Sequence, residues 1–302
     1  MIGVRQITVG VGLHPRTGKP DVGSVRAALQ AAWIAARVDA KVTLLCAAWA
    51  DDSSGPVELG QTAMEELTIL SGLVGDHGVQ VEIEVVEDYP WHALVARALA
   101  GKADLVVAGK RATEGSVRRR IGSTAVKLLR KCPVPVWLVK PDHDLMQRHV
   151  LAATDFSEVS SEAVDAAAWV AEQSEGELHV FHAWNLTPIE MRAAADLPQA
   201  EYDALIESHR TRALSELERQ VGGLDVDPTL HLERGVAHAE LLREAEEEHP
   251  DLIVMGTLSR GGRSGFLVGT TAERLVGQVD ESLLCFKPRD FESPVVLPAT
   301  DG

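Results

Sequence analysis

The sequence predicts an α/β protein made of two tandem copies of one domain, each a parallel sheet with helices on both faces. Three observations predict this. The chain has 302 residues, one segment repeats at a fixed spacing, and short apolar runs alternate with longer amphipathic ones. The length exceeds a typical domain of roughly 100–200 residues. Alternating strands and helices favour a parallel sheet, because right-handed crossovers place the helices on its two faces.

The repeat is clearest at a constant offset of 147 residues. Segments 104–112 and 122–124 of the first copy lie without a gap on segments 251–259 and 269–271 of the second copy. Upstream the first copy has eight extra residues, 14–21. We therefore expect a first domain at 1–143, a polar junction at 141–147, a second domain at 148–290 and a tail at 291–302.

The elements follow from the period of apolar residues, taken in chain order through the second copy. Apolar runs of strand length predict strands at 149–153, 178–183, 226–232, 252–255 and 282–286. Amphipathic segments between them predict helices at 160–172, 199–221, 237–248 and 270–279. Ligands of such sheets bind beyond the carboxyl ends of the strands, at the point where the strand order reverses.

Composition and charge exclude several classes of protein. The formal net charge is −16, with 17 basic and 16 acidic residues in 1–145 against 12 and 29 in 146–302. This balance argues against non-specific nucleic-acid binding, which needs clustered lysine and arginine. We find no apolar run of the roughly 20 residues that span a bilayer and no secretory signal, so we expect a cytoplasmic protein without membrane contact. Three scattered cysteines indicate buried, reduced thiols.

A glycine-rich segment follows the fourth predicted strand of the second copy. It begins at Gly256, continues through Ser259 and Arg260, and leads to Gly269, Thr270 and Thr271 at the start of the last predicted helix. Glycines let backbone N–H groups approach phosphate oxygens, and a helix N-terminus offers further donors. The alternative is a glycine-rich connection that ends in an ordinary threonine N-cap.

An acidic residue follows the first predicted strand of the second copy, in the segment Thr154-Asp155-Phe156-Ser157-Glu158. The Asp155 carboxylate could accept hydrogen bonds from a ribose or act through a metal. The alternative is capping of the next helix by Asp155 or Ser157.

With these two segments in one repeat, the chain resembles the universal stress protein family in its tandem two-domain form. The family signature is Gly, two residues, Gly, nine residues, Gly and then Ser or Thr. Here it falls on Gly256, Ser259, Gly269 and Thr270, with Ser259 in place of the second glycine. The segment 154–158 is similar to the family's first-strand acid motif. The resemblance implies Rossmann-like domains of the adenine nucleotide alpha hydrolase-like type, each with a five-stranded parallel sheet.

The resemblance also implies a ligand, ATP or another adenine nucleotide, with Mg²⁺. It places Thr154 and Asp155 near the ribose and the backbone of Ala183 against the adenine. It places Gly256, Ser259, Arg260, Gly269, Thr270 and Thr271 around the phosphates. Finally, it implies pairing of the two copies through their last strands, 134–140 and 282–287, with a homodimer as a further expectation.

The first copy carries a degenerate form of the site. Gly109, Ala112, Gly122 and Ser123 occupy the signature positions, Ala112 replaces the second glycine, and Gly12 replaces the strand-end acid. The eight-residue insertion is expected to reshape the mouth of the pocket. We therefore expect the nucleotide mainly in the second copy.

Other signals are weaker. Segment 12–20 departs from a P-loop in spacing and has Pro20 where Ser or Thr must bind magnesium. His179 and His182 are three residues apart on a predicted strand, which is a poor zinc geometry. Trp137 in the last strand of the first copy is interpreted as core or interface.

No residue stands out as catalytic. The preferred hypothesis is therefore a stress-response protein of binding type. A nucleotide-free interaction module and a slow ATPase or self-phosphorylating protein are the alternatives.

Overall fold

The computed structural model describes residues 3–14, 17–47, 56–110, 122–142, 144–257, 272, 274–275 and 277–297. The first copy contains β1 (Gln6–Gly10), β2 (Lys41–Ala47), β3 (Val81–Val86), β4 (Leu105–Gly109), β5 (Val136–Val139), α1 (Val22–Val38), α2 (Pro56–Gly75), α3 (Pro90–Leu99) and α4 (Ser123–Lys131). The second copy contains β6 (His149–Ala153), β7 (Glu177–Trp184), β8 (Thr229–Arg234), β9 (Leu252–Gly256), β10 (Ser282–Phe286), α5 (Glu158–Gln173), α6 (Pro188–Ala194), α7 (Gln199–Val221) and α8 (Ala237–Glu248).

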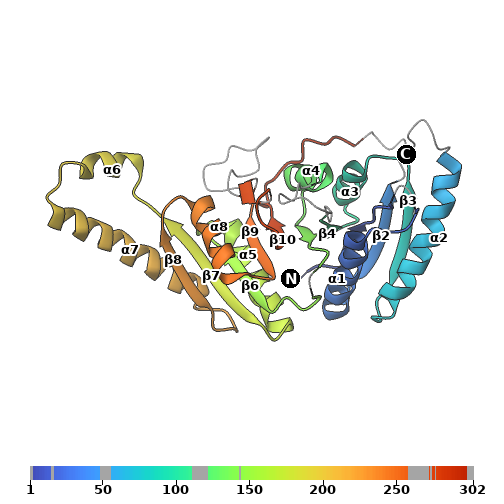
Figure 1. The fold of residues 1–302 in the computed structure, drawn as a ribbon, viewed down its shortest axis with the longest axis horizontal. Helices are drawn as coiled ribbons and strands as arrows, with labels where there is room; N and C mark the ends of the chain where they lie inside the picture. The colour runs from blue at the N-terminus through green and yellow to red at the C-terminus, as the bar shows by residue number, and fades with distance from the viewer. Residues whose placement is uncertain are drawn as a thin grey trace.

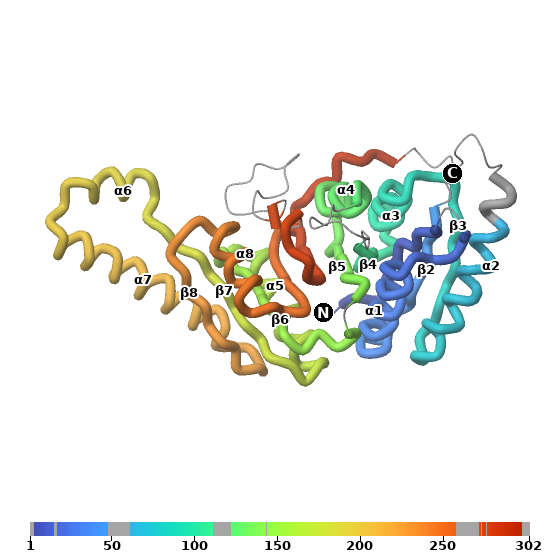
Figure 2. The backbone as a smooth tube through the Cα atoms, in the orientation of Figure 1, coloured from blue at the N-terminus to red at the C-terminus, as the bar shows by residue number. Residues whose placement is uncertain are grey.

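These strands form one ten-stranded sheet in the order β3-β2-β1-β4-β5-β10-β9-β6-β7-β8 (Figure 1). Strands within each copy are parallel, and the order reverses between β1 and β4 and between β6 and β9. The α/β architecture predicted from the sequence, with a five-stranded parallel sheet in each copy, is thus confirmed. Figure 2 shows the first copy, blue to green, on one side of the molecule and most of the second copy on the other.

The two copies join through their last strands. β5 and β10 pair antiparallel, with Leu138 opposite Leu283 and Trp137 opposite Leu284. Each of these strands would otherwise be a sheet edge with unpaired backbone groups. The pairing therefore makes the sheet continuous across the whole chain.

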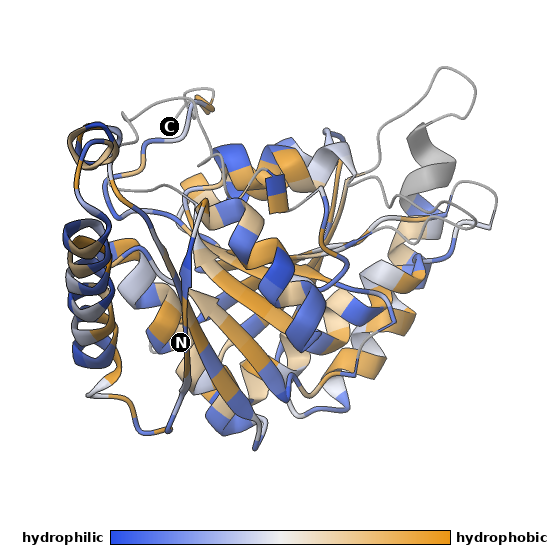
Figure 3. Cartoon of the chain, turned by 60° about the vertical axis from the view of Figure 1, so that its left-hand side comes forward, coloured by the Kyte–Doolittle hydropathy of each residue, from blue (hydrophilic) through white to orange (hydrophobic). Residues whose placement is uncertain are grey.

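Helices cover both faces of the sheet, and the apolar side chains of the strands alternate between the two faces. Residues of α1, α2, α5 and α7 share one buried cluster, and residues of α3, α4 and α8 share the other. In Figure 3 the central strands are coloured mostly hydrophobic, and the helices around them mix hydrophobic and hydrophilic residues. Because both clusters contain residues of both copies, each face has one continuous core.

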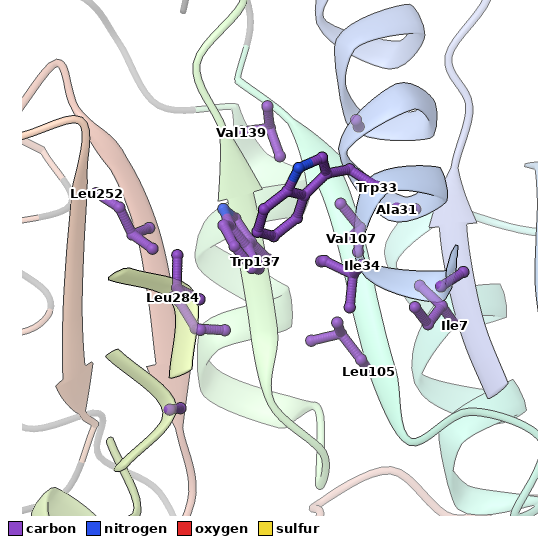
Figure 4. Packing of buried hydrophobic residues seen from close by; sticks show 14 of the residues in the cluster. Ile7, Ala31, Trp33, Ile34, Leu105, Val107, Trp137, Val139, Leu252 and Leu284 are labelled. Carbon is purple, nitrogen blue, oxygen red and sulfur yellow. The ribbon is translucent and has the colours of Figure 1, made fainter. Parts of the chain in front are cut away.

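Aromatic residues fill the core at the junction of the copies. Trp137 is fully buried on β5, and Trp33 of α1 makes an edge contact with Trp169 of α5 at a centroid distance of 6.1 Å. Figure 4 draws Trp137, Trp33 and Leu284 in this cluster. Aromatic pairs of this geometry contribute beyond the area that they bury. The interpretation of Trp137 as a core or interface residue is confirmed.

Two lysine ammonium groups also cross the junction. Lys110, next to the end of β4, donates to the carbonyls of Val279 and Glu281, and Lys287 donates to the carbonyl of Leu129 in α4. Burial lowers the pKa of each lysine to about 8. Each ammonium group therefore donates hydrogen bonds to the other copy and faces away from bulk solvent.

The repeat has a structural basis in one pair of aspartates. Asp104 Oδ2 accepts hydrogen bonds from the N–H groups of Arg5 and Gln6, both 2.9 Å long. Asp251 Oδ2 accepts the equivalent bonds from Arg148 and His149 at 2.9 and 3.0 Å. In each copy, the aspartate before the fourth strand therefore holds the start of the first strand in place.

Two elements differ clearly from the sequence prediction, whereas β7, β9 and α5 extend beyond their predicted bounds by only one or two residues. β8 begins at Thr229 and not at residue 226, since Pro228 has no N–H group to donate to a neighbouring strand. α6 was not predicted, although Thr187 and Glu190 form a capping box with Pro188 in the first turn. The predicted helix at 270–279 lies largely outside the described residues. None of the described helices is long and apolar enough to cross a membrane.

The three cysteines are free and buried, as predicted. Burial raises the pKa of Cys46 to about 11 and the pKa of Cys132 and Cys285 to about 12. The pKa of a cysteine thiol in an unfolded chain is about 8.5. We expect no reaction of the native protein with a thiol-specific chromogenic disulfide at pH 8, and reaction of three thiols after unfolding in guanidinium. Rapid modification of any thiol in the native protein would contradict this burial.

Candidate functional site

The candidate site is the carboxyl edge of the sheet in the second copy. β6 and β9 lie side by side and parallel, with Ala153 opposite Met255. Thr154 and Asp155 therefore follow β6 next to Gly256, which ends β9. The strand order reverses between these two strands, so a crevice is expected at this edge. Ser259, Arg260, Gly269, Thr270 and Thr271, and Ala112 of the first copy, lie outside the described residues.

The Asp155 carboxylate takes part in the turn into α5. Its Oδ1 accepts hydrogen bonds from the N–H and the hydroxyl of Ser157, at 3.1 and 2.5 Å. Ser157 is the N-cap of α5 and accepts from the N–H of Ser160. Helix capping, the alternative weighed for this segment, is thus present. Within the described part of the chain Asp155 Oδ2 accepts no hydrogen bond, which leaves one carboxylate oxygen for a ligand.

Thr154 is a buried structural residue. Its hydroxyl lies 3.0 Å from Ser160 Oγ and donates to Gln220 Oε1 of α7 at 2.9 Å. The same oxygen accepts from the N–H of Phe156 at 3.0 Å. Thr154 therefore holds the strand-end turn against α5 and α7, and it supports the adjacent Asp155 rather than facing a ligand with its hydroxyl.

His182 completes this support. Its Nδ1 lies 2.8 Å from the carbonyl oxygen of Thr154, and its ring lies 4.1 Å from the ring of Phe156. Phe156 has φ of 62°, a left-handed conformation that is rare for bulky side chains. The histidine and the phenylalanine fix the unusual turn that presents Asp155. The sequence spacing argues against His182 as a zinc ligand and favours a core or surface histidine, but it gives no sign of this role.

The Ala183 backbone faces the same edge. Pairing between β6 and β7 ends at Ala153 and Phe181, and the carbonyl of Phe181 accepts from the N–H of Thr154. In a parallel strand, alternate residues direct both backbone groups to the same side. The N–H and C=O of Ala183 therefore point to the β6 side, beyond the last paired residue of β6.

Gly256 permits close packing of α5 on the end of β9. A Cβ at this position would lie 3.0 Å from Val159 Cγ1 and 3.7 Å from the N–H nitrogen of Ser160. The glycine thus brings the first turn of α5 against the strand end. That turn belongs to the helix whose N-cap, Ser157, donates hydrogen bonds to Asp155, so Asp155 and Gly256 are coupled through α5.

In the first copy, the equivalent glycine packs more tightly. A Cβ on Gly109 would lie 2.2 Å from the carbonyl carbon of Gly23, in the first turn of α1. Backbone thus meets backbone at the end of β4, and the next residue, Lys110, directs its ammonium toward the second copy. Gly122 precedes α4, which begins at Ser123.

The insertion in the first copy supplies an acid that the sequence pattern did not predict. Asp21 is the N-cap of α1 and accepts from the N–H of Ser24 at 2.7 Å. Its other oxygen, Oδ2, lies 3.1 Å from the position that a Cβ on Gly12 would occupy. The carboxylate missing at Gly12 is thus replaced from the insertion. An aspartate immediately before an amphipathic helix is the signal that could have revealed it.

A separate cavity of about 660 Å³ lies between the copies, lined among others by Asp104, Pro135, Trp169 and Arg289. It does not touch Thr154, Asp155, Ala183 or Gly256.

Both copies of the chain match one known protein family. The profile of the universal stress protein family matches residues 7–140 and again 146–287. Universal stress protein E of Salmonella typhi is 30% identical over 236 residues, which are 74% of each chain. Universal stress protein E of Escherichia coli K12 is 30% identical over 232 residues, 73% of this chain and 72% of that protein.

Solved structures share the whole fold. A functionally unknown protein from Pseudomonas aeruginosa PAO1 matches with a TM-score of 0.70 and 22% identity, over 95% of this chain and 94% of its own. A universal stress protein from Archaeoglobus fulgidus matches with a TM-score of 0.66 and 18% identity, over 94% and 98%. The tandem arrangement of two such copies in one chain therefore recurs in solved proteins.

Proposed function

Because this chain belongs to the universal stress protein family, we propose that its second copy binds an adenine nucleotide, ATP with Mg²⁺, at the carboxyl edge of β6, β7 and β9. The observation that carries the proposal is the meeting of Asp155, the Ala183 backbone and Gly256 at the point where the strand order reverses. This is the place where open α/β sheets bind their ligands.

Each described residue has a distinct role in the proposal. Asp155 Oδ2 accepts a hydrogen bond from a ribose hydroxyl while Oδ1 keeps its bonds to Ser157. The Ala183 N–H and C=O pair with the adenine edge. Gly256 opens the segment whose further residues, Ser259, Arg260, Gly269, Thr270 and Thr271, surround the phosphates, in keeping with the glycine-rich pattern of the sequence.

The proposal is tested by calorimetric titration of Mg-ATP into the wild type, Asp155→Ala and Ser157→Ala. Loss of a hydrogen bond to a charged group costs about 1.5–3 kcal/mol, so we expect roughly 10- to 150-fold weaker binding in Asp155→Ala. Ser157→Ala removes the hydroxyl bond to Asp155 Oδ1 and the cap, but it keeps the carboxylate and the bond from the N–H of residue 157. Its affinity is expected to stay within a few-fold of the wild type.

Three outcomes would contradict the assignment. Equal affinity in wild type and Asp155→Ala would remove Asp155 from the site. Nucleotide binding that survives Gly269→Val but is lost on replacing Gly122 would move the site to the first copy. The absence of any heat with Mg-ATP would favour a nucleotide-free interaction module.

The proposal treats the protein as a binding protein, with hydrolysis of ATP slow if it occurs. Phosphate release that persists after stringent purification would favour the slow ATPase. A cytoplasmic location and a homodimer are part of the same proposal, and the mass in solution tests the dimer.

A further inference from the structure

Three histidines and two glutamates meet on one face of the second copy, away from the proposed nucleotide site. His149, His179 and His231 come from the neighbouring strands β6, β7 and β8, and Glu244 and Glu248 come from α8. Ligand atoms of His149, His179 and Glu248 all lie within 4.8 Å of one another. We propose that these three residues bind a divalent transition metal ion of the zinc type.

The fold explains why these side chains meet. Neighbouring strands place alternate side chains on the same face, and β6, β7 and β8 are consecutive in the sheet. α8 covers this face through Leu241 and Ala245, which pack in the same buried cluster as Phe181 of β7. Glu244 and Glu248 are four residues apart, so both carboxylates lie on one side of this helix.

The distances suit zinc. Glu248 Oε2 lies 3.7 Å from His149 Nε2. Ligands about 2.1 Å from a tetrahedral zinc ion are about 3.4 Å apart, so small side-chain movements close the site. Imidazole and carboxylate are also the ligand types that zinc accepts. The fourth position is left to water or to Glu177, whose Oε2 lies 3.8 Å from His179 Nε2.

One ligand atom has no hydrogen-bond partner among the described residues. His149 Nε2 is buried and, among the described residues, forms no hydrogen bond. An unsatisfied buried polar atom costs free energy, and a metal ion would coordinate the lone pair of this nitrogen. The distance of 3.7 Å to Glu248 is too long for a hydrogen bond and leaves space for an ion between the two.

The remaining two residues, His231 and Glu244, orient the His179 ring through a chain of hydrogen bonds. His179 Nδ1 lies 2.8 Å from His231 Nε2, and His231 Nδ1 contacts the buried carboxylate of Glu244. With Glu244 ionised, His231 donates to it, and His179 donates in turn to His231. This chain leaves a lone pair on His179 Nε2. Metal-binding histidines are commonly oriented by such a second hydrogen bond. When bound, the ion would tie the last turn of α8 to the strands beneath it.

The site is separate from the nucleotide site. His149 begins β6 whereas Asp155 follows its end, six residues later, or roughly 20 Å along a strand. A metal ion bound here therefore acts on the stability of the second copy and does not touch the nucleotide. Its test is accordingly independent of the proposed function.

The experiment uses the full chain, stripped with a chelator and titrated with zinc chloride. We expect one zinc ion per chain and a melting temperature that rises until this ratio is reached. His149→Gln and Glu248→Gln are each expected to bind zinc at least tenfold more weakly. His209→Gln is the matched control, because His209 also faces a glutamate, Glu190 at 3.4 Å, but lies on α7 outside the cluster. Its zinc affinity should equal that of the wild type.

Three results would overturn the proposal: no zinc bound by the wild type, unchanged zinc affinity in both ligand variants, or equal loss in His209→Gln. Circular dichroism of the metal-free variants shows whether each one folds, and either ligand variant alone carries the test. Cobalt substitution gives a second readout, since its visible spectrum should indicate tetrahedral coordination in the wild type and change in Glu248→Gln. Asp155→Ala should leave zinc binding unchanged.

Discussion

Replacing Gly109 with alanine is expected to lower the free energy of unfolding by about 3 kcal/mol or more. The new Cβ would lie 2.2 Å from the carbonyl carbon and 2.3 Å from the carbonyl oxygen of Gly23. Both atoms belong to backbone, so no rotamer change relieves the clash. β4 and the first turn of α1 must separate, and both belong to the central core of the first copy. Denaturant unfolding followed by circular dichroism measures the loss.

Gly72→Ala is the matched control for this prediction. Gly72 lies in α2, where an added Cβ meets nothing within 4 Å. Alanine is favoured over glycine inside a helix by roughly 0.5–1 kcal/mol, so this variant should be slightly more stable than the wild type. If Gly109→Ala were as stable as Gly72→Ala, the close contact between α1 and β4 would be wrong.

Replacing Trp137 with alanine is expected to cost about 3–5 kcal/mol, the range for removing a buried large aromatic side chain. Trp137 is fully buried, stands opposite Leu284 of β10 and fills the core where the two copies join. The cavity would therefore weaken the contact between the copies as well as the first copy itself. Denaturant unfolding and limited proteolysis within the junction would both report this change.

Trp137→Phe separates packing from hydrogen bonding at this position. Among the described residues the indole Nε1 of Trp137 has no hydrogen-bond partner, so losing it breaks no bond. The phenyl ring also keeps most of the apolar contact. We expect a loss well below that of Trp137→Ala. Equal losses in the two variants would show that the indole N–H matters and would contradict this account of the junction.

Much of the fold follows from the periodicity of the sequence. The predicted bounds of β6, β10, α7 and α8 agree with the structure, because their apolar patterns are long or are bounded by polar residues. The repeat predicted that both copies share one topology, and the equivalent bonds of Asp104 and Asp251 give that repeat a physical cause. The local sequence pattern was sufficient to predict the bounds of an element wherever that element buries a regular face.

Features that depend on contacts between distant segments could not be read in this way. Asp21 places a carboxylate near Gly12, at the end of the first strand. This position depends on how the insertion folds back onto that strand. The histidine cluster depends on the order of three strands and on the placement of α8, whereas the local sequence spacing relates His179 only to His182. The turn at Asp155 likewise needs His182 and Gln220, which lie 27 and 65 residues away.

The central claim is that the carboxyl edge of β6 and β9 holds an adenine nucleotide. A crystal structure grown in excess Mg-ATP tests it most directly. We predict the ribose within hydrogen-bond distance of Asp155 Oδ2 and the adenine against the backbone of Ala183. Nucleotide bound only over β1 and β4, or an edge of the second copy left empty at saturating Mg-ATP, would contradict the claim.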